Sequence, residues 1–405
     1  MFQISGKKIN TNIYFFLLII LPLMDSLNGL INGGGNENGL SLGIIYRIVI
    51  VIVSFSYWLL YGVDRKYLLY FLFVLFYLTI SALRSSLFLF SYLVLMFKMI
   101  LPIIIIITLK ILYENNIFNK KSITDILNIW QFLFPLTLLI AYVLGIGFAT
   151  YSSNATNLSV DSSVGFKGLY YAQNDISYVM DILYYYSLKK LLKRKNIVNI
   201  IGYFLSLSSV LLLGLKSGYI LVIIITIFMF IQQLKKKREL ISSFFFLLFV
   251  IVGFIFSFSI FSNDISKVVD RWQYFYQNRT SFFSFLTSMR SDRIVPINNW
   301  VNSVYGLIGI LFGTGYNYAH ISGSIVPEIV EMDLIDIYFQ IGIIGIILIY
   351  GFYFRIYFQN SKTSFYSNAF VLTILISTFN GHVFETALSG VFFAIICSGI
   401  FIKED

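Results

Sequence analysis

The sequence is poor in charge, and this shortage sets its class. Only 12% of its 405 residues are charged, whereas 58% are hydrophobic. A soluble protein of this length would need far more polar surface, so the composition excludes a soluble globular fold. We therefore expect an integral membrane protein.

Cysteine and histidine are also scarce. The single cysteine, Cys397, excludes a disulfide framework. Two histidines, His320 and His382, are too few for a conventional metal site. The sequence contains no P-loop, no glycine-rich dinucleotide fingerprint and no zinc-type cluster. We therefore expect neither a metal nor an organic cofactor.

Basic residues are in excess, with a formal net charge of +10. Such a charge is compatible with nucleic-acid binding. The lysines and arginines, however, fall mostly in short groups between apolar runs, where they set membrane topology and meet anionic lipid. We expect membrane lipid, and not nucleic acid, as the partner of these groups.

Apolar stretches long enough to cross about 30 Å of hydrocarbon recur along the whole chain. They lie near residues 13–30, 41–61, 67–83, 87–109, 126–147, 173–192, 197–214, 218–233, 241–261, 334–358, 364–381 and 384–402. The first stretch lacks the cleavage pattern of a signal peptide. The sequence thus predicts an all-α, polytopic membrane protein with about twelve transmembrane helices, organised as a single domain over residues 1–405.

The basic groups also assign a side to each connection, because short cytoplasmic connections are enriched in lysine and arginine. In a twelve-span arrangement the groups at 65–66, 189–195 and 235–238 lie inside, and both termini are cytoplasmic. Residues 262–333, between the ninth and tenth spans, then form one large extracytoplasmic loop, which we expect to carry the active site. The connection 148–172 also lies outside and, being rich in Ser, Asn and Gly, is expected to be solvated or mobile.

The 262–333 segment carries charges of opposite sign in its two halves. Five cations gather in the first half: Lys267, Arg271, Arg279, Arg290 and Arg293. The second half ends in an acidic run, PEIVEMDLID. Arginine forks suit a phosphate or pyrophosphate, and carboxylates suit a general base or a sugar hydroxyl. A salt-bridge network between the two halves accounts for the same residue types, so both readings stay open.

Several short motifs follow one another in a recognisable order. They are NDIS at 174–177, LLLGLKSGYI at 211–220, SMRSDRI at 288–294, LFGTGYN at 311–317 and DLIDIYFQIGIIGII at 333–347. In this order and on these predicted sides, the chain resembles the O-antigen polymerase and ligase superfamily. It is most similar to Wzy-type polymerases of capsular polysaccharide or exopolysaccharide.

This resemblance implies a metal-independent glycosyltransferase in the cytoplasmic membrane, with its active site on the extracytoplasmic face. Such an enzyme transfers an undecaprenyl-pyrophosphate-linked glycan onto a lipid-linked oligosaccharide repeat unit. Donor and acceptor are therefore both lipid-linked, and flippase and chain-length regulator proteins are the expected protein partners. Because the leaving group already carries the activation, the scheme requires neither ATP nor a metal.

The resemblance also suggests residue roles. Arg290 and Arg293 are expected to stabilise the departing pyrophosphate, with Lys216 assisting in the place of a family arginine. Asp333 is the first choice for orienting or deprotonating the acceptor hydroxyl, and Glu331 is the second. Further substrate-binding roles are expected for Arg271, Arg279, Asn174, His320 and Tyr316.

Two alternatives remain. A ligase-like enzyme would transfer glycan to a wall or lipid acceptor and would share every motif. Ligases that act on lipid A, however, carry a histidine where this chain has Glu331 and Asp333. A flippase for the same lipid-linked unit would also have about twelve spans, but flippases are built from repeats, and none is apparent here. We therefore favour the polymerase.

Overall fold

The computed structural model describes residues 12–32, 41–84, 89–151, 164–234, 240–315, 317, 329–360, 364–381 and 383–402. About 83% of these residues are helical. The chain divides into two compact units. The first comprises residues 1–15, 47–123 and 278–405, and the second comprises residues 16–46 and 124–277.

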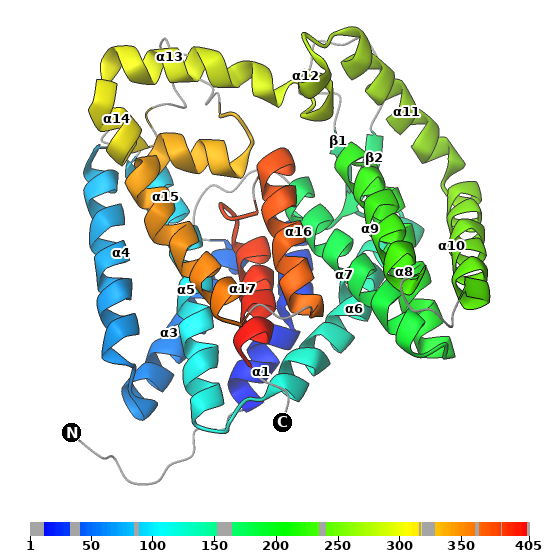
Figure 1. Ribbon diagram of the computed structural model, residues 1–405, viewed down its shortest axis with the longest axis horizontal. Helices are drawn as coiled ribbons and strands as arrows, with labels where there is room; N and C mark the ends of the chain where they lie inside the picture. Colours follow the sequence, from blue (N-terminus) through cyan, green and yellow to red (C-terminus); the bar gives the residue numbers. More distant parts are fainter. Residues whose placement is uncertain are drawn as a thin grey trace. The chain divides into compact units, whose positions relative to one another are not determined.

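The first unit is built around a buried helix near the end of the chain. Its elements are α4 (Arg65–Arg84), α5 (Leu89–Glu114), α12 (Phe282–Leu286), the 3-10 turn η3 (Arg290–Arg293), α13 (Ile294–Val304), α14 (Gly306–Phe312), α15 (Asp333–Asn360), α16 (Phe365–Asn380) and α17 (Ala387–Phe401). Helix α17, red in Figure 1, contacts α5, α15 and α16. A Cβ on Gly390 would lie 2.9 Å from Pro102 of α5, so a small residue allows this close approach.

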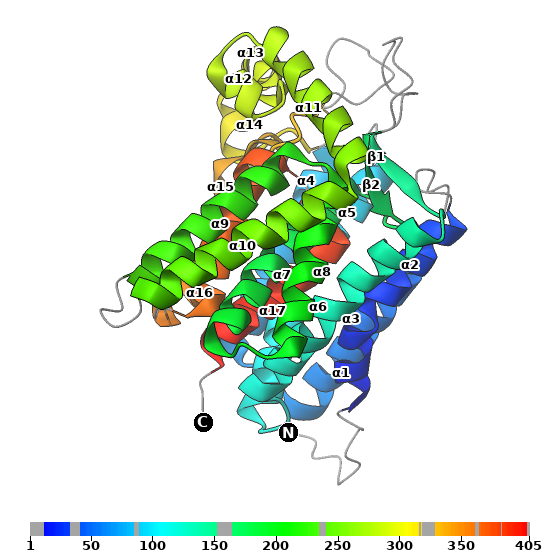
Figure 2. The same cartoon turned by 90° about the vertical axis from the view of Figure 1, so that its right-hand side faces the viewer.

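The second unit is a set of neighbouring helices with a small hairpin. Its elements are α2 (Leu21–Ile31), β1 (Phe148–Tyr151), β2 (Val164–Gly168), α7 (Gln173–Lys193), α8 (Ile197–Leu213), α9 (Lys216–Leu234), α10 (Leu240–Ile260) and α11 (Ser262–Gln277). Figure 2 shows α7 to α10 side by side, and their contacts agree with that view. Three helices pass from one unit into the other: α1 (Asn12–Ile19), α3 (Leu42–Tyr61) and α6 (Lys120–Val143).

The connection after α6 contains a pair of short strands. Strands β1 and β2 pair antiparallel, and residues 152–163 between them lie outside the described residues. Lys167 of β2 is only 8% exposed, and its Nζ donates a hydrogen bond to the carbonyl of Tyr171 at 2.7 Å. Burial lowers the pKa of the Lys167 ammonium. The described ends of the connection are therefore paired as strands and partly buried, and the expectation that the connection is solvated or mobile stays a prediction.

The apolar helices confirm an all-α fold of membrane-spanning type. Six described helices, α3, α4, α5, α6, α9 and α15, are long and apolar enough to cross a membrane. The number rises to nine if each of three bent helix pairs counts as one span. Every predicted window coincides with a helix or a bent pair, but α8, α16 and α17 have only 17, 16 and 15 residues. The count of twelve therefore stays a prediction.

The predicted loop 262–333 is largely helical where it is described. Helix α11 belongs to the second unit, whereas α12, η3, α13 and α14 belong to the first. The run Arg290–Val304 and helix α14 are together as apolar as a span, but they meet at 119°. This geometry is that of a broken span or a re-entrant loop, and Gly306 at the bend has a φ of +54°.

Helix α15 is itself interrupted, at Gly342, where φ is 67° and ψ is −177°. A break of this kind frees carbonyl groups of the preceding turn, which need other donors in an apolar environment. The donors come from α4 and from the segment after α14. The amide of Thr314 donates to Phe339 (2.8 Å), the hydroxyl of Ser81 to Gln340 (3.3 Å) and the hydroxyl of Tyr77 to Ile341 (2.6 Å).

Two glycines make this junction possible. A Cβ on Gly342 would lie 2.4 Å from the carbonyl oxygen of Leu311, and a Cβ on Gly313 would lie 2.3 Å from that of Gln340. Both glycines have positive φ, at 67° and 74°. Backbone therefore packs directly on backbone between the end of α14 and the break in α15, and no larger residue fits.

We predict that Gly342→Ala lowers the midpoint of thermal unfolding in detergent strongly. Alanine at φ 67° and ψ −177°, a region essentially confined to glycine, costs about 1–3 kcal/mol, and the clash with a fixed carbonyl adds to that cost. Gly351→Ala is the matched control in the same helix, since a Cβ there meets no heavy atom within 4 Å. Equal midpoints for the two variants would show that the junction does not hold α15 in place.

Candidate functional site

The two central arginines are positioned by a short, well-anchored turn. Arg290 and Arg293 begin and end η3, which continues directly into α13. Asp292, in the same turn, accepts hydrogen bonds from the hydroxyls of Thr280 at 2.8 Å and Ser284 at 2.7 Å. These bonds fix the turn to the residues around α12.

Both guanidinium groups converge on the carboxylate of Glu331. The Nε of Arg290 lies 3.1 Å from Oε2, and Nη1 of Arg293 lies 3.6 Å from Oε1. Backbone carbonyls also orient the two guanidinium groups. Arg293 donates a hydrogen bond to the carbonyl of Ile329 at 2.8 Å, and Arg290 donates one to the carbonyl of Phe379 at 3.5 Å. The side chain of Arg290 is 13% exposed, that of Arg293 is 49% exposed and that of Glu331 is 36% exposed. The cluster is thus ordered and still open to a ligand.

Backbone strain is concentrated at this cluster. Among the described residues, four non-glycine residues have positive φ, and three of them lie here: Ser288 (54°), Met289 (67°) and Glu331 (65°). Left-handed conformations are unfavourable for such residues and persist only where the surroundings impose them. Gly381 is part of these surroundings, because a Cβ there would lie 2.2 Å from the carbonyl oxygen of Glu331.

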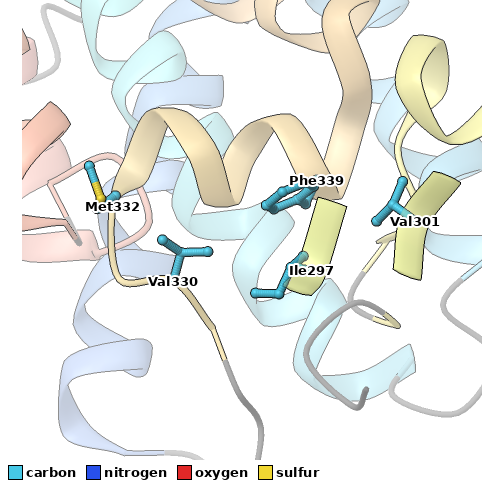
Figure 3. Packing of buried hydrophobic residues seen from close by; sticks show 5 residues of the cluster. All are labelled: Ile297, Val301, Val330, Met332 and Phe339. Carbon is cyan, nitrogen blue, oxygen red and sulfur yellow. The ribbon is translucent and has the colours of Figure 1, made fainter. Parts of the chain in front are cut away.

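A hydrophobic cluster supports both sides of the ion pair. It consists of five buried residues, shown in Figure 3: Ile297, Val301, Val330, Met332 and Phe339. The first two come from α13, directly after the arginines, and Phe339 comes from α15. Glu331 stands between Val330 and Met332, which are 0% and 2% exposed. Packing therefore holds the arginine turn and the Glu331 segment against one another.

The carboxylates at the start of α15 bond to backbone amides. Asp333 is fully buried, and its Oδ2 accepts from the amides of Val383 at 2.6 Å and Phe384 at 2.9 Å. Asp336 is also fully buried and accepts from two amides of the segment before the helix, at 2.9 Å each. This is the geometry of positioning residues. Glu331 is the more accessible of the two carboxylates expected to act on the acceptor.

In the second unit, two predicted substrate-binding cations meet on one aromatic ring. The Nζ of Lys216 lies 5.5 Å from the ring centroid of Phe275, and Cζ of Arg271 lies 5.2 Å from it. Arg271 also lies 3.6 Å above the ring of Tyr151. These are cation–π distances. In the part of the chain that the structure describes, Nε of Arg271 has no hydrogen-bond partner.

Asn174 belongs to a buried polar face of α7. It lies in the first turn of the helix and is 5% exposed, and Ser177 and Asp181 follow it at helical spacing. Helix α9 approaches this face at Gly218, where a Cβ would lie 3.5 Å from Oδ1 of Asp181. The predicted role of Asn174 is therefore compatible with a buried polar site, although its Oδ1 bonds to nothing within the described ranges.

The predicted site residues thus form two groups, one in each unit. Arg290, Arg293, Glu331 and Asp333 gather in the first unit, which also contains the half-buried Arg279. The second unit contains Lys216, Arg271 and Asn174. Tyr316, His320 and His382 lie outside the described residues. Over the described ranges, no group of three or more His, Cys, Asp or Glu side chains could hold a metal ion.

Sequence reasoning missed two parts of the cluster. Gly381 follows Asn380, and an Asn-Gly pair is a turn signal that could have been used. Asp292 had no expected role, whereas it holds the arginine turn through the hydroxyls of Thr280 and Ser284. No sequence pattern predicts that Thr280 and Ser284 bond to Asp292.

Comparison with known proteins identifies no relative: no family model, no curated protein and no solved structure matches this chain.

We predict that Asp333→Ala destabilises the protein far more than Glu331→Ala. Removal of the Asp333 carboxylate leaves two buried amides without an acceptor, at a cost of about 1–3 kcal/mol each. The Glu331 pair is partly exposed, and exposed ion pairs contribute about 0–1 kcal/mol. Thermal unfolding of the two variants in the same detergent measures the difference. A similar loss of stability in both would contradict the positioning role of Asp333.

Proposed function

We propose that this chain is a membrane glycosyltransferase of the polysaccharide polymerase type. It would transfer an undecaprenyl-pyrophosphate-linked glycan onto a lipid-linked oligosaccharide repeat unit. The proposal rests on the order of the sequence motifs and on one geometric observation. Arg290 and Arg293 direct their guanidinium groups at a single anionic group, the carboxylate of Glu331.

This convergence suits a diphosphate. Two guanidinium groups that reach one carboxylate from two sides also match the spread of oxygens on a pyrophosphate. The Glu331 carboxylate then occupies the place that phosphate oxygens would take. Since Arg293 and Glu331 are partly exposed, an entering pyrophosphate can exchange with the carboxylate without unfolding the cluster.

The exchange of the Glu331 carboxylate for pyrophosphate suggests separate roles for the arginines and for Glu331 in the reaction. The acceptor hydroxyl oxygen attacks the anomeric carbon of the donor, a new glycosidic C–O bond forms, and the C–O bond to the pyrophosphate breaks. Arg290 and Arg293 stabilise the charge on the departing undecaprenyl pyrophosphate. Glu331, released from the arginines by that anion, accepts the hydroxyl proton. Asp333 holds the 383–384 segment beside it.

The proposed location is the cytoplasmic membrane, with both termini inside and the Arg290 cluster on the extracytoplasmic face. The apolar helices support a membrane-embedded protein. The sidedness rests on the distribution of basic residues between the apolar stretches. Lys216, Arg271, Arg279 and Asn174 are proposed to bind the lipid-linked substrates, as are His320 and Tyr316.

The experiment is an elongation assay with purified protein and lipid-linked repeat units in detergent, analysed for a ladder of longer products. We predict that Arg290→Ala lowers the rate by roughly 100- to 1,000-fold, as for loss of one transition-state charge contact. Arg290→Lys should lower the rate less than Arg290→Ala does, because lysine retains the positive charge and lacks only the planar, bidentate guanidinium group. Arg65→Gln, at the start of α4, is the control for loss of an exposed arginine.

The outcomes separate the candidate functions. A ladder that Arg290→Ala abolishes in a normally folded protein supports the polymerase. Transfer to an acceptor that is not lipid-linked, without a ladder, would favour the ligase-like enzyme. Movement of repeat units between leaflets without elongation would favour the flippase. An unchanged ladder with both Arg290→Ala and Glu331→Ala would remove the proposed site.

A further inference from the structure

The first unit contains a cavity of about 450 Å³ at the far end of α15 from Glu331. It is enclosed by the start of α4, the end of α5 and the second half of α15, which lie beside one another (Figure 1). A neighbouring cavity of about 380 Å³ shares Tyr67, Lys110 and Phe352 with it. Neither cavity has a part in the glycosyl transfer proposed above.

The lining of the larger cavity contains three cations. Lys66, Lys110 and Arg355 line it, together with a single acidic residue, Asp64. One oxygen of Asp64 already accepts the backbone amide of Lys66 at 2.9 Å, as a helix cap does. Lys110 is held in place by the ring of Tyr67, 4.0 Å from its Nζ, and by Glu114 at 3.6 Å. The cavity therefore offers a net positive lining for an anion.

The lining also contains apolar side chains. They include Ile347, Leu348 and Phe352, and the hydroxyl of Tyr70, which also lines the cavity, donates to the carbonyl of Leu348 at 2.8 Å. Gly351 leaves free space beside the lining, because a Cβ there would meet no heavy atom within 4 Å. A lining with both cations and apolar side chains fits a ligand that is itself amphipathic.

The cavity also lies at the level where candidate membrane spans end. Helix α4 begins at Arg65, α5 ends at Glu114 and α15 ends at Asn360, and all three are candidate spans. Charged residues at span ends meet the lipid headgroups, and basic pockets between spans bind anionic ones. Only 28% of the apolar window of α4 is buried inside the protein, so lipid can reach the cavity along this helix.

We infer that this cavity binds the phosphate-bearing headgroup of an anionic phospholipid. The phosphate would lie between Lys66 and Arg355, with Lys110 behind it, and the first part of an acyl chain would follow Ile347 and Leu348. A free phosphate would engage the cations but leave the apolar lining residues without a partner. The lipid therefore matches both kinds of lining residue, whereas the ion matches only the cations.

The test is thermal unfolding of the purified full-length protein in detergent, with three additives in parallel: phosphatidylglycerol, phosphatidylcholine and inorganic phosphate. Phosphatidylglycerol should raise the unfolding midpoint, because a ligand that binds the folded state stabilises it. Phosphatidylcholine and inorganic phosphate should leave the midpoint unchanged. Native mass spectrometry of the same samples should show retained phosphatidylglycerol.

Variants locate the site. The double variant Lys66→Gln/Arg355→Gln should weaken phosphatidylglycerol binding by roughly 30-fold, because each basic residue contributes about a fivefold factor. Arg65→Gln, one residue away and not part of the lining, should keep the shift. Gly351→Leu should fill the cavity and so abolish the midpoint shift caused by phosphatidylglycerol. If the double variant does not fold, Gly351→Leu alone tests whether the lipid binds in this cavity.

Three results would overturn the inference. One is an equal midpoint shift in the wild type, the double variant and Gly351→Leu. The second is an equal shift with phosphatidylcholine, which would remove the requirement for anionic charge. The third is an equal shift with inorganic phosphate alone, which would remove the requirement for a lipid. None of these readouts depends on glycosyl transfer, so the inference can fail or stand apart from the proposed function.

Discussion

The carbonyls that bond outside the helix at the break in α15 constrain the architecture of the first unit. Backbone polar groups in an apolar environment need partners, and a helix that stops at Gly342 must find them outside itself. Side chains of α4 and the amide of Thr314 supply them. These bonds tie α4, α14 and α15 together at one level, and the glycine contacts allow the required approach. The first turns of α15 are thereby fixed in direction, and with them the Glu331 segment, which leads directly into the helix.

The apolar pattern was sufficient to locate the helices but not to count the spans. Each predicted window holds a helix or a bent pair, because a long apolar run in a membrane protein has to satisfy its own backbone. Breaks inside such runs are less visible. The pattern gives no sign that α1 and α2 bend by 52° or that α15 breaks at Gly342. Helix α7 was counted as a lipid-crossing span, yet it is buried over most of its length and rich in tyrosine.

The ion pairs of the site could be expected from the sequence, because the two halves of the 262–333 segment carry charges of opposite sign. The contact between Arg290 and Glu331 joins residues 41 positions apart, as a charge-pairing network would. The role of Asp333 was not predictable in this way. Its partners are backbone amides at 383 and 384, and every residue has an amide, so no residue type marks them. Charge patterns identify charged partners, whereas backbone partners emerge only from the fold.

Helix α15 has a different proposed anion-binding arrangement at each of its two ends. Before its first turn, Arg290 and Arg293 meet a carboxylate that belongs to the protein. Near its last turn, Arg355 joins Lys66 beside a cavity whose acidic residue is already engaged with an amide. In the proposed function, a diphosphate displaces the carboxylate of the first arrangement. In the further inference, the second arrangement binds a ligand with a negative charge and an apolar tail. The length of α15, a candidate span, separates the two arrangements. A lipid bound near the last turn of α15 would therefore stabilise the helix whose first turn positions Glu331.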